Sequence, residues 1–385
     1  MPEQTPLAPT SPPRATDPLN YWDYLKLNHL LDLQGGHEPD DRALVPDELL
    51  FIIVHQCYEL WFKQVIRELR EAIRCLGDST VPEAEVPNVV HHLRRVVAIL
   101  RLAVEQFSVM ETLTPQDFLG FRDKLVPASG FQSFQMREME ILLGLEEGAR
   151  EAYGQTAVLD HIRELGQSSA AGRYAWARVD AAVAEAASGG TLRQALASWL
   201  YRTPIQGSQP IDPGDNEAVI GFISDYLQAL EAHHSTQIEA LLRARVSPEA
   251  DVRRRFAMSL EGARRFLHAQ DRPEAEQAAT RRARAGLLYV ESYRSFPLLA
   301  WPRLLVDTVV ELEEQLVLWR QRHARMVERV IGRRVGTGGS SGVEYLDRTT
   351  QSRVFTDLWN VRTLLLPKDH LPPARNVAYY GFVAP

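Results

Sequence analysis

The chain has 385 residues, of which 45% are hydrophobic and 24% charged, and these values are ordinary for a soluble globular protein. Its formal net charge is −7 at pH 7, and the charges are spread along the chain, which argues against a nucleic-acid-binding surface. No apolar run reaches the roughly 18 residues that a membrane span needs, so we expect no membrane segment. Two cysteines, Cys57 and Cys75, are too few for a disulfide framework and favour a reducing cytoplasm.

The N-terminus is rich in proline and lacks the apolar core of a signal peptide. Six prolines fall within the first eighteen residues, so residues 1–19 are predicted to form a disordered tail. No internal repeat is visible, and no interior linker is long enough to separate domains. We therefore expect one domain over residues 20–375, followed by a C-terminal tail at 376–385.

Two helices are predicted near the start of this domain. Residues 21–34 carry tyrosines and leucines at near-helical spacing. Residues 48–76 form a longer helix, for which Asp47 is the expected N-terminal cap. Its first half is apolar on most sides, which is typical of a buried central helix. His55 follows Phe51 by one turn in this apolar setting, where a hydrogen-bonded core histidine is the simplest interpretation.

An arginine in an apolar setting stands out in the next part of the chain. Residues 89–113 form an amphipathic helix, and Thr114 with a following proline starts another. That helix carries Phe118 and leads to Arg122, just before a break at residues 127–130. The planar guanidinium of an arginine there could bind a carboxylate through two hydrogen bonds. A surface arginine in a helix salt bridge is the alternative.

The remaining pattern is also helical, because no segment alternates polar and apolar residues over several strands. We expect an all-α fold built around a bundle of its longest helices. Adjacent histidines at 91–92 and 233–234 have no further ligand at helical spacing to support a metal site. Further helices are predicted at residues 131–143, 145–190, 191–203, 217–244, 249–269, 275–296, 304–332 and 353–366.

The helix at 304–332 and the loop after it combine two unusual features. Its apolar stripe advances in steps of three and four residues, and His323 occupies a stripe position between Trp319 and Met326. Residues 336–342 contain four glycines, two serines and a threonine, without the lysine of a phosphate-binding loop. Considered alone, the histidine fits a core position and the loop fits a long turn. Together they could form a ligand site beside a substrate clamp.

Several stretches in the same order along the chain resemble the tryptophan 2,3-dioxygenase family. The shorter matches are the two tyrosines and leucine of residues 21–25 and RVFTDLWNVRTLLLP at 353–367. The resemblance extends from residue 20 to about residue 370. The five motifs that carry it are FIIVHQCYELWFKQ at 51–64, LTPQDFLGFRDKLVPASGFQSFQ at 113–135, WLYRTP at 199–204, WRQRHARMVERVIG at 319–332 and GTGGSSGVEYL at 336–346.

The resemblance implies a haem b cofactor and assigns residues to it. His323 corresponds to the proximal ligand of the haem iron, with Trp319 beside it in the same motif. Ser129 and Gly130 correspond to residues against the distal face of the haem. These assignments agree with the pattern of the residues themselves, because haem iron takes a neutral imidazole from a rigid element in apolar surroundings.

The resemblance also assigns residues to a substrate. His55 corresponds to the residue that accepts the indole N–H, and Phe51 to one that packs on the indole ring. Phe118 holds a position that is tyrosine in some members of the family and phenylalanine in others. Arg122 would bind the substrate carboxylate, and Thr337 would hold its ammonium together with a haem propionate.

The implied function is insertion of O2 across the indole C2–C3 bond of L-tryptophan, within an intertwined all-helical homotetramer. Tyr21 and Tyr24 would reach into the pocket of a neighbouring subunit. One alternative is a related haem oxygenase acting on a substituted indole or another aromatic amino acid. A second is a non-catalytic haem-binding or sensor protein, in which Arg122 and Thr337 would have no purpose. A helical scaffold without haem is a third.

Overall fold

The computed structural model describes residues 20–77, 81, 83–127, 129–150, 158–245 and 247–381. The predicted disordered tail at 1–19 lies outside these residues. Within them the chain forms α-helices and short 3-10 helices, and the only β-type pairing is an isolated bridge between Ile205 and Ser208. The all-α prediction is therefore confirmed.

The α-helices are α1 (Tyr21–Leu25), α2 (Leu27–Leu30), α3 (Pro46–Gly77), α4 (Val86–Met110), α5 (Pro115–Phe121), α6 (Phe134–Leu143), α7 (Val158–Gly166), α8 (Ala170–Gly189), α9 (Leu192–Tyr201), α10 (Asp215–Ala244), α11 (Glu249–Leu267), α12 (Glu274–Ser292), α13 (Ala300–Ile331), α14 (Val343–Thr349) and α15 (Thr356–Leu364). The 3-10 helices are η1 (Asp41–Ala43), η2 (Glu83–Glu85), η3 (Arg122–Leu125), η4 (Gly130–Gln132), η5 (Glu147–Ala149), η6 (Pro297–Leu299), η7 (Lys368–His370) and η8 (Val377–Tyr380).

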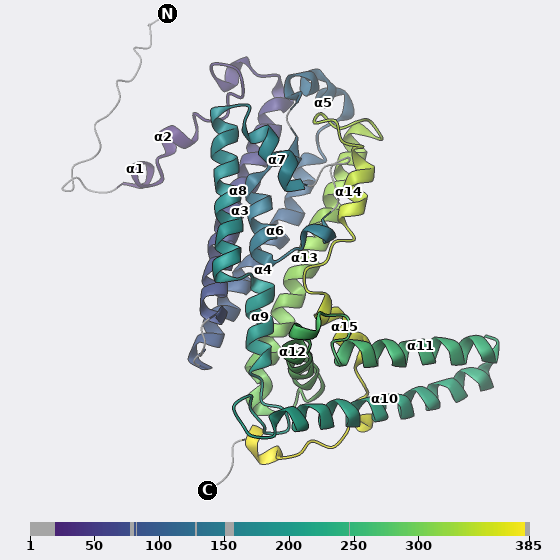
Figure 1. Ribbon diagram of the computed structural model, residues 1–385. Helices are drawn as coiled ribbons and strands as arrows, with labels where there is room; N and C mark the ends of the chain where they lie inside the picture. The colour runs from purple at the N-terminus through teal and green to yellow at the C-terminus, as the bar shows by residue number, and fades with distance from the viewer. Residues whose placement is uncertain are drawn as a thin grey trace, which may run out of the picture.

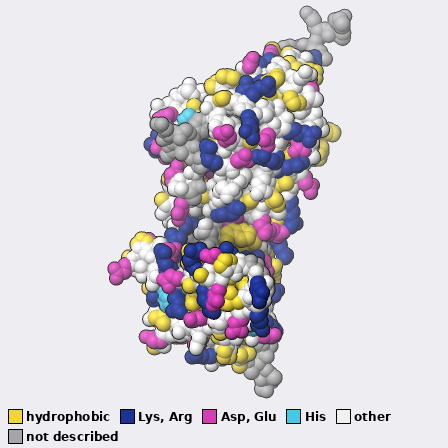
Figure 2. All heavy atoms as spheres, turned by 90° about the vertical axis from the view of Figure 1, so that its right-hand side faces the viewer, with side chains coloured by type: hydrophobic (Ala, Val, Ile, Leu, Met, Phe, Trp, Pro, Cys, Tyr) yellow, Lys and Arg dark blue, Asp and Glu magenta, His cyan; other side chains and the backbone are white. Residues whose placement is uncertain are grey.

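The long helices α3, α4, α8 and α13 run along the length of the body, with α6 beside them (Figure 1). Helix α4 packs against both α3 and α13, and α6 packs against α3 and α8. Helices α9, α12 and α15 lie at the lower end of the body, where α10 and α11 form a hairpin that projects from it (Figure 1). On the side from which the hairpin projects, acidic and basic side chains are interspersed (Figure 2).

Helix α3 is the central helix that the sequence predicts, with a different start. It begins at Pro46, so Asp47 lies in the first turn and is not the N-terminal cap. Proline suits this position because the first helical N–H groups have no partner within the helix. By length and composition alone, α3 is also the one helix of the described residues that could cross a membrane. In this fold it packs against α4, α6 and α9.

The predicted helix at 21–34 is broken in two. Lys26 has a φ of +52°, and its backbone N–H donates to the Asp23 carbonyl, which ends α1. No residue of α1 or α2 is buried, and both helices stand away from the body (Figure 1). The side chains of Tyr21 and Tyr24 are 70% and 72% exposed.

Hydroxyl side chains set the starts of two short helices near the upper end of the body. Helix α5 begins where the sequence predicts, and the Thr114 hydroxyl caps it by accepting a hydrogen bond from the Asp117 N–H. The predicted helix at 131–143 starts later, because η4 occupies its beginning. The Ser133 hydroxyl then accepts from the Met136 N–H and caps α6.

The described part of the C-terminal segment is packed onto the body. Tyr380 is 1% exposed, and its hydroxyl oxygen accepts a hydrogen bond from the Gly207 N–H at 2.7 Å. The same hydroxyl donates to the Pro204 carbonyl at 2.9 Å. These bonds attach η8 to the loop between α9 and α10.

Candidate functional site

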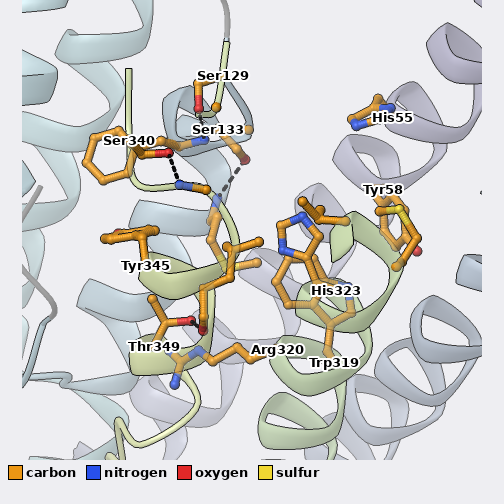
Figure 3. A pocket seen from close by; sticks show the side chains of 18 of the residues that line it. His55, Tyr58, Ser129, Ser133, Trp319, Arg320, His323, Ser340, Tyr345 and Thr349 are labelled. Carbon is orange, nitrogen blue, oxygen red and sulfur yellow. Dashed lines mark hydrogen bonds between the residues drawn. The ribbon is translucent and has the colours of Figure 1, made fainter. Parts of the chain in front are cut away.

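A cavity of about 280 Å³ opens between α3, α5, α6 and α13, with η4 and the glycine-rich loop at its border. Figure 3 shows His323 beside Trp319 on α13, with His55 apart from them and Ser129, Ser133 and Ser340 grouped on another side. Tyr21 and Tyr24 do not line the cavity. The residues predicted from the sequence that do line it are Phe51, His55, Phe118, Arg122, Ser129, Gly130, Trp319, His323 and Thr337.

His323 is held in an aromatic environment on the buried stripe of α13. The Phe107 ring stacks on its imidazole at a centroid distance of 5.7 Å and an angle of 12°, and the Trp319 ring lies at 5.1 Å. Burial and, to a smaller extent, the nearby His55 together lower the pKa of His323 to about 4. The imidazole is therefore neutral at pH 7. Neither of its nitrogens has a hydrogen-bond partner among the described residues, so it offers a lone pair to a metal.

His55 is set in a single tautomer by its own helix. Its Nδ1 lies 2.7 Å from the Phe51 carbonyl oxygen. Because a carbonyl can only accept, Nδ1 carries the proton and donates it. Burial lowers the pKa of His55, while the hydrogen bond to Phe51 acts in the opposite direction more weakly. The neutral ring therefore presents Nε2 as a hydrogen-bond acceptor.

Three phenylalanines form an apolar wall next to His55. The Phe51 ring lies 4.0 Å from the His55 ring, 6.0 Å from Phe118 and 5.5 Å from Phe121. Phe118 and Phe121 meet edge to face at 5.3 Å. Such walls suit a flat aromatic ligand, because edge and face contacts between rings are favourable at these distances.

Arg122 connects this wall to the glycine-rich loop. One of its terminal nitrogens donates to the Val335 carbonyl at 2.7 Å, while its buried Nε has no hydrogen-bond partner. The loop closes on itself, since the Gly336 N–H donates to the Ser340 carbonyl at 3.0 Å. At Gly342 the φ is +65°, and a Cβ would lie 2.5 Å from the Arg334 carbonyl oxygen, so only glycine fits there.

Ser129 and Gly130 shape the opposite border of the cavity. The Ser129 hydroxyl accepts from the Phe131 N–H at 3.3 Å, which fixes the start of η4. A Cβ added at Gly130 would meet no atom within 4 Å. The missing side chain therefore leaves open space at this border, which a flat group could occupy.

The cavity also contains a cluster of charged residues that the sequence analysis did not single out. Glu140 lies 3.0 Å from Arg137, 3.1 Å from Arg320 and 4.0 Å from Arg150. Burial acts to raise the pKa of Glu140, but the three guanidinium groups outweigh it and hold the pKa below its ordinary value. The only sequence signal was charge within apolar segments, as in MREMEILL at 136–143. Charges at this helical spacing are typical of ion pairs on a helix surface, so the pattern did not indicate a buried cluster.

The fold and the cavity define an all-helical protein in which two histidines and a half-buried arginine line one cavity. Among the described residues no group of three histidine, cysteine or carboxylate side chains could hold a metal ion. A metal here would take its other ligands from a prosthetic group. The family model for tryptophan 2,3-dioxygenase matches residues 13–365, and the chain belongs to this family.

Several curated relatives cover most of the chain. A tryptophan 2,3-dioxygenase of Sorangium cellulosum is 44% identical, over 96% of this chain and 89% of the relative. Tryptophan 2,3-dioxygenase 2 of Ralstonia nicotianae is 47% identical, over 95% of this chain and 98% of the relative. A tryptophan 2,3-dioxygenase-like protein of Xanthomonas campestris is 46% identical over 276 residues, which is 70% of this chain and 98% of the relative.

Proposed function

We propose that this chain is a haem-dependent dioxygenase that adds both atoms of O2 across the indole C2–C3 bond of L-tryptophan and releases N-formylkynurenine. The family match over residues 13–365 and the names of its relatives support this reaction. The observation that carries the proposal is the meeting of His323, His55 and Arg122 in one cavity. In this cavity His323 would bind the metal, His55 would accept the indole N–H and Arg122 would pair with the carboxylate.

The residues of the cavity fit haem b, on which the family depends. His323 is a neutral, half-buried imidazole and would be the single protein ligand to the iron. The buried Nε1 of Trp319, one turn away, has no hydrogen-bond partner and can donate to an oxygen of a bound group. Ser129 and Gly130 would border the opposite face. When bound, haem supplies the iron that activates O2.

The other lining residues would orient the amino acid. His55 Nε2 accepts the indole N–H, and the rings of Phe51 and Phe118 pack on the indole. Arg122 would bind the carboxylate, and Thr337 in the loop would hold the ammonium together with a haem propionate. Fixing both ends of the substrate would hold C2 and C3 of the indole in one orientation within the cavity. His55 serves as an acceptor that positions the ring and needs no large change of charge.

The alternatives raised by the sequence are less well supported. A substituted indole lacking N–H would leave His55 Nε2 without its partner, at a cost in affinity. A haem-binding sensor would not need an arginine whose Nε is buried and unpaired in the cavity. The family match and its relatives also favour tryptophan dioxygenation over both.

The assembly proposed for the chain is a homotetramer in the cytoplasm. Helix α3 exposes Ile53 and Leu60, and α4 exposes Leu102 and Val109. Each pair is seven residues apart, so each lies on one face of its helix. The detached α1–α2 segment would reach a neighbouring subunit, where the exposed Tyr21 and Tyr24 complete its pocket. Neither cysteine is in a disulfide, which agrees with a reducing compartment. Light scattering of Leu60→Asp tests the assembly, since a tetramer that persists unchanged would argue against this surface.

The reaction is tested by loading the protein with haem, reducing the iron and adding L-tryptophan in air. We expect N-formylkynurenine to accumulate, detected by its absorbance and mass. His323→Ala, the matched variant, should retain no stable haem and form no product. A fully haem-loaded wild-type protein that leaves L-tryptophan unchanged would refute the proposal.

A further inference from the structure

The charged cluster at the cavity joins three elements around one carboxylate. Arg137 and Glu140 lie one turn apart on α6, and Arg150 follows η5. Arg320 lies on α13, three residues before His323, and donates to the Ser352 carbonyl at 3.1 Å. In Figure 3 the Arg320 side chain extends from the same stretch of α13 as Trp319 and His323. All four charged residues line the cavity that contains His323.

The cluster holds more positive than negative charge. The side chains of Arg137, Arg150 and Arg320 are 12%, 5% and 9% exposed. Among the described residues, the carboxylates paired with them are Glu140 and Glu147. Three guanidinium groups thus face two carboxylates. Glu147 is 45% exposed, so water weakens its electrostatic attraction to Arg150. One buried positive charge is left without a full counter-charge.

Two donors of the cluster are also unused. The Nε atoms of Arg137 and Arg150 are buried and have no hydrogen-bond partner. A buried charge and buried N–H groups without partners are both unfavourable, so a protein retains them where a ligand completes them. The group that completes this cluster must be an anion with oxygen acceptors, because every unpaired group here except a Glu140 oxygen is a donor. A carboxylate matches the guanidinium geometry.

We propose that Arg137 and Arg150 bind a carboxylate of the haem cofactor, with Glu140 and Arg320 holding them in position. This inference rests on the proposed function. A haem b carries two propionate carboxylates, and the cluster adjoins His323 through Arg320 on α13. The carboxylate of the amino acid has a separate partner in Arg122, which is tied to the glycine-rich loop through Val335. The cluster is therefore assigned to the cofactor and not to the substrate.

The experiment compares iron protoporphyrin IX with its dimethyl ester, in which both carboxylates are capped. The rate of haem loss to an excess of an acceptor apoprotein is measured for wild type, Arg150→Met and Arg150→Lys. The matched control is Arg178→Met, because Arg178 pairs with Glu138 and does not line the cavity. Far-UV circular dichroism of each variant verifies the helical fold. Arg150→Met leaves the exposed Glu147 in water, where it needs no partner.

We expect esterification to speed haem loss from the wild type by about tenfold or more, the effect of one charge-assisted hydrogen bond. Arg150→Met should lose natural haem faster by a similar factor and show a smaller effect of esterification. Arg150→Lys should restore much of the slow haem loss of the wild type, and Arg178→Met should behave like wild type. An esterification effect equal in wild type and Arg150→Met would overturn the inference while leaving the proposed function intact. A wild type that binds neither porphyrin would instead refute the proposed function.

Discussion

Replacing Arg122 by glutamine should weaken the binding of L-tryptophan and leave tryptamine, which lacks the carboxylate, nearly unaffected. In the structure the Arg122 Nε is buried and unpaired at the cavity, while a terminal nitrogen contacts the Val335 carbonyl. The substrate carboxylate would accept a charge-assisted hydrogen bond from this unpaired donor, which contributes roughly 1.5–3 kcal/mol. The dissociation constant for L-tryptophan should therefore rise by about 10- to 150-fold.

The assay is a titration of the haem-loaded protein in which each ligand changes the haem absorbance. Arg122→Lys is the matched variant, because it keeps the positive charge but loses the planar pair of donors. We expect its affinity for L-tryptophan to fall between those of wild type and Arg122→Gln. Equal weakening of L-tryptophan and tryptamine in Arg122→Gln would refute the reasoning, because it would mean that Arg122 acts only by holding the loop through Val335.

Three further predictions follow from polar groups at the cavity and in the core. His55→Ala should weaken L-tryptophan binding by about tenfold, the effect of one hydrogen bond to the indole N–H. The same variant should bind 1-methyl-L-tryptophan as well as the wild type does. Equal loss of affinity for both ligands in this titration would contradict the role of His55 as acceptor. The pKa of His323 is about 4 in the fold and 6.5 ordinarily, so as the pH falls the unfolded chain takes up the proton first. The free energy of unfolding of the haem-free protein should thus fall by on the order of 3 kcal/mol between pH 6.5 and pH 4. Denaturant titrations across this pH range measure the loss, and His323→Phe should remove it. Glu313 accepts hydrogen bonds from the Phe355 N–H at 3.1 Å and from Trp359 Nε1 at 2.5 Å. Glu313→Ala should therefore lower the free energy of unfolding, measured in urea, by about 3 kcal/mol. A change near zero would show that these donors find other partners.

The sequence alone located the histidine of α13 because the helix is long and its stripe is regular. Every apolar stripe residue from Leu305 to Val330 is buried or packed against the core, so the face of His323 could be read from spacing alone. The loop after it could be predicted from its four glycines, although a long turn would have the same composition. Such local signals also explain why the start of α5 at Thr114 and the following proline could be predicted.

Features that depend on contacts between distant segments could not be read in this way. The break in the first helix depends on a left-handed Lys26, and lysine carries no signal for that conformation. The cluster around Glu140 brings α6 and the nearby Arg150 together with Arg320 of α13, which lies 180 residues from Glu140 in the chain. The bond from Arg122 to Val335 spans more than two hundred residues. The chemistry of each residue type was evident, but only the fold shows which of them meet.

The central claim is that both atoms of one O2 molecule enter the indole ring of L-tryptophan. The most direct measurement is turnover by the haem-loaded ferrous protein under oxygen-18 gas in unlabelled water, followed at once by mass spectrometry of the product. The proposed reaction predicts that both oxygens added to the product carry the label. A product with a single labelled oxygen would contradict it and identify a mono-oxygenase.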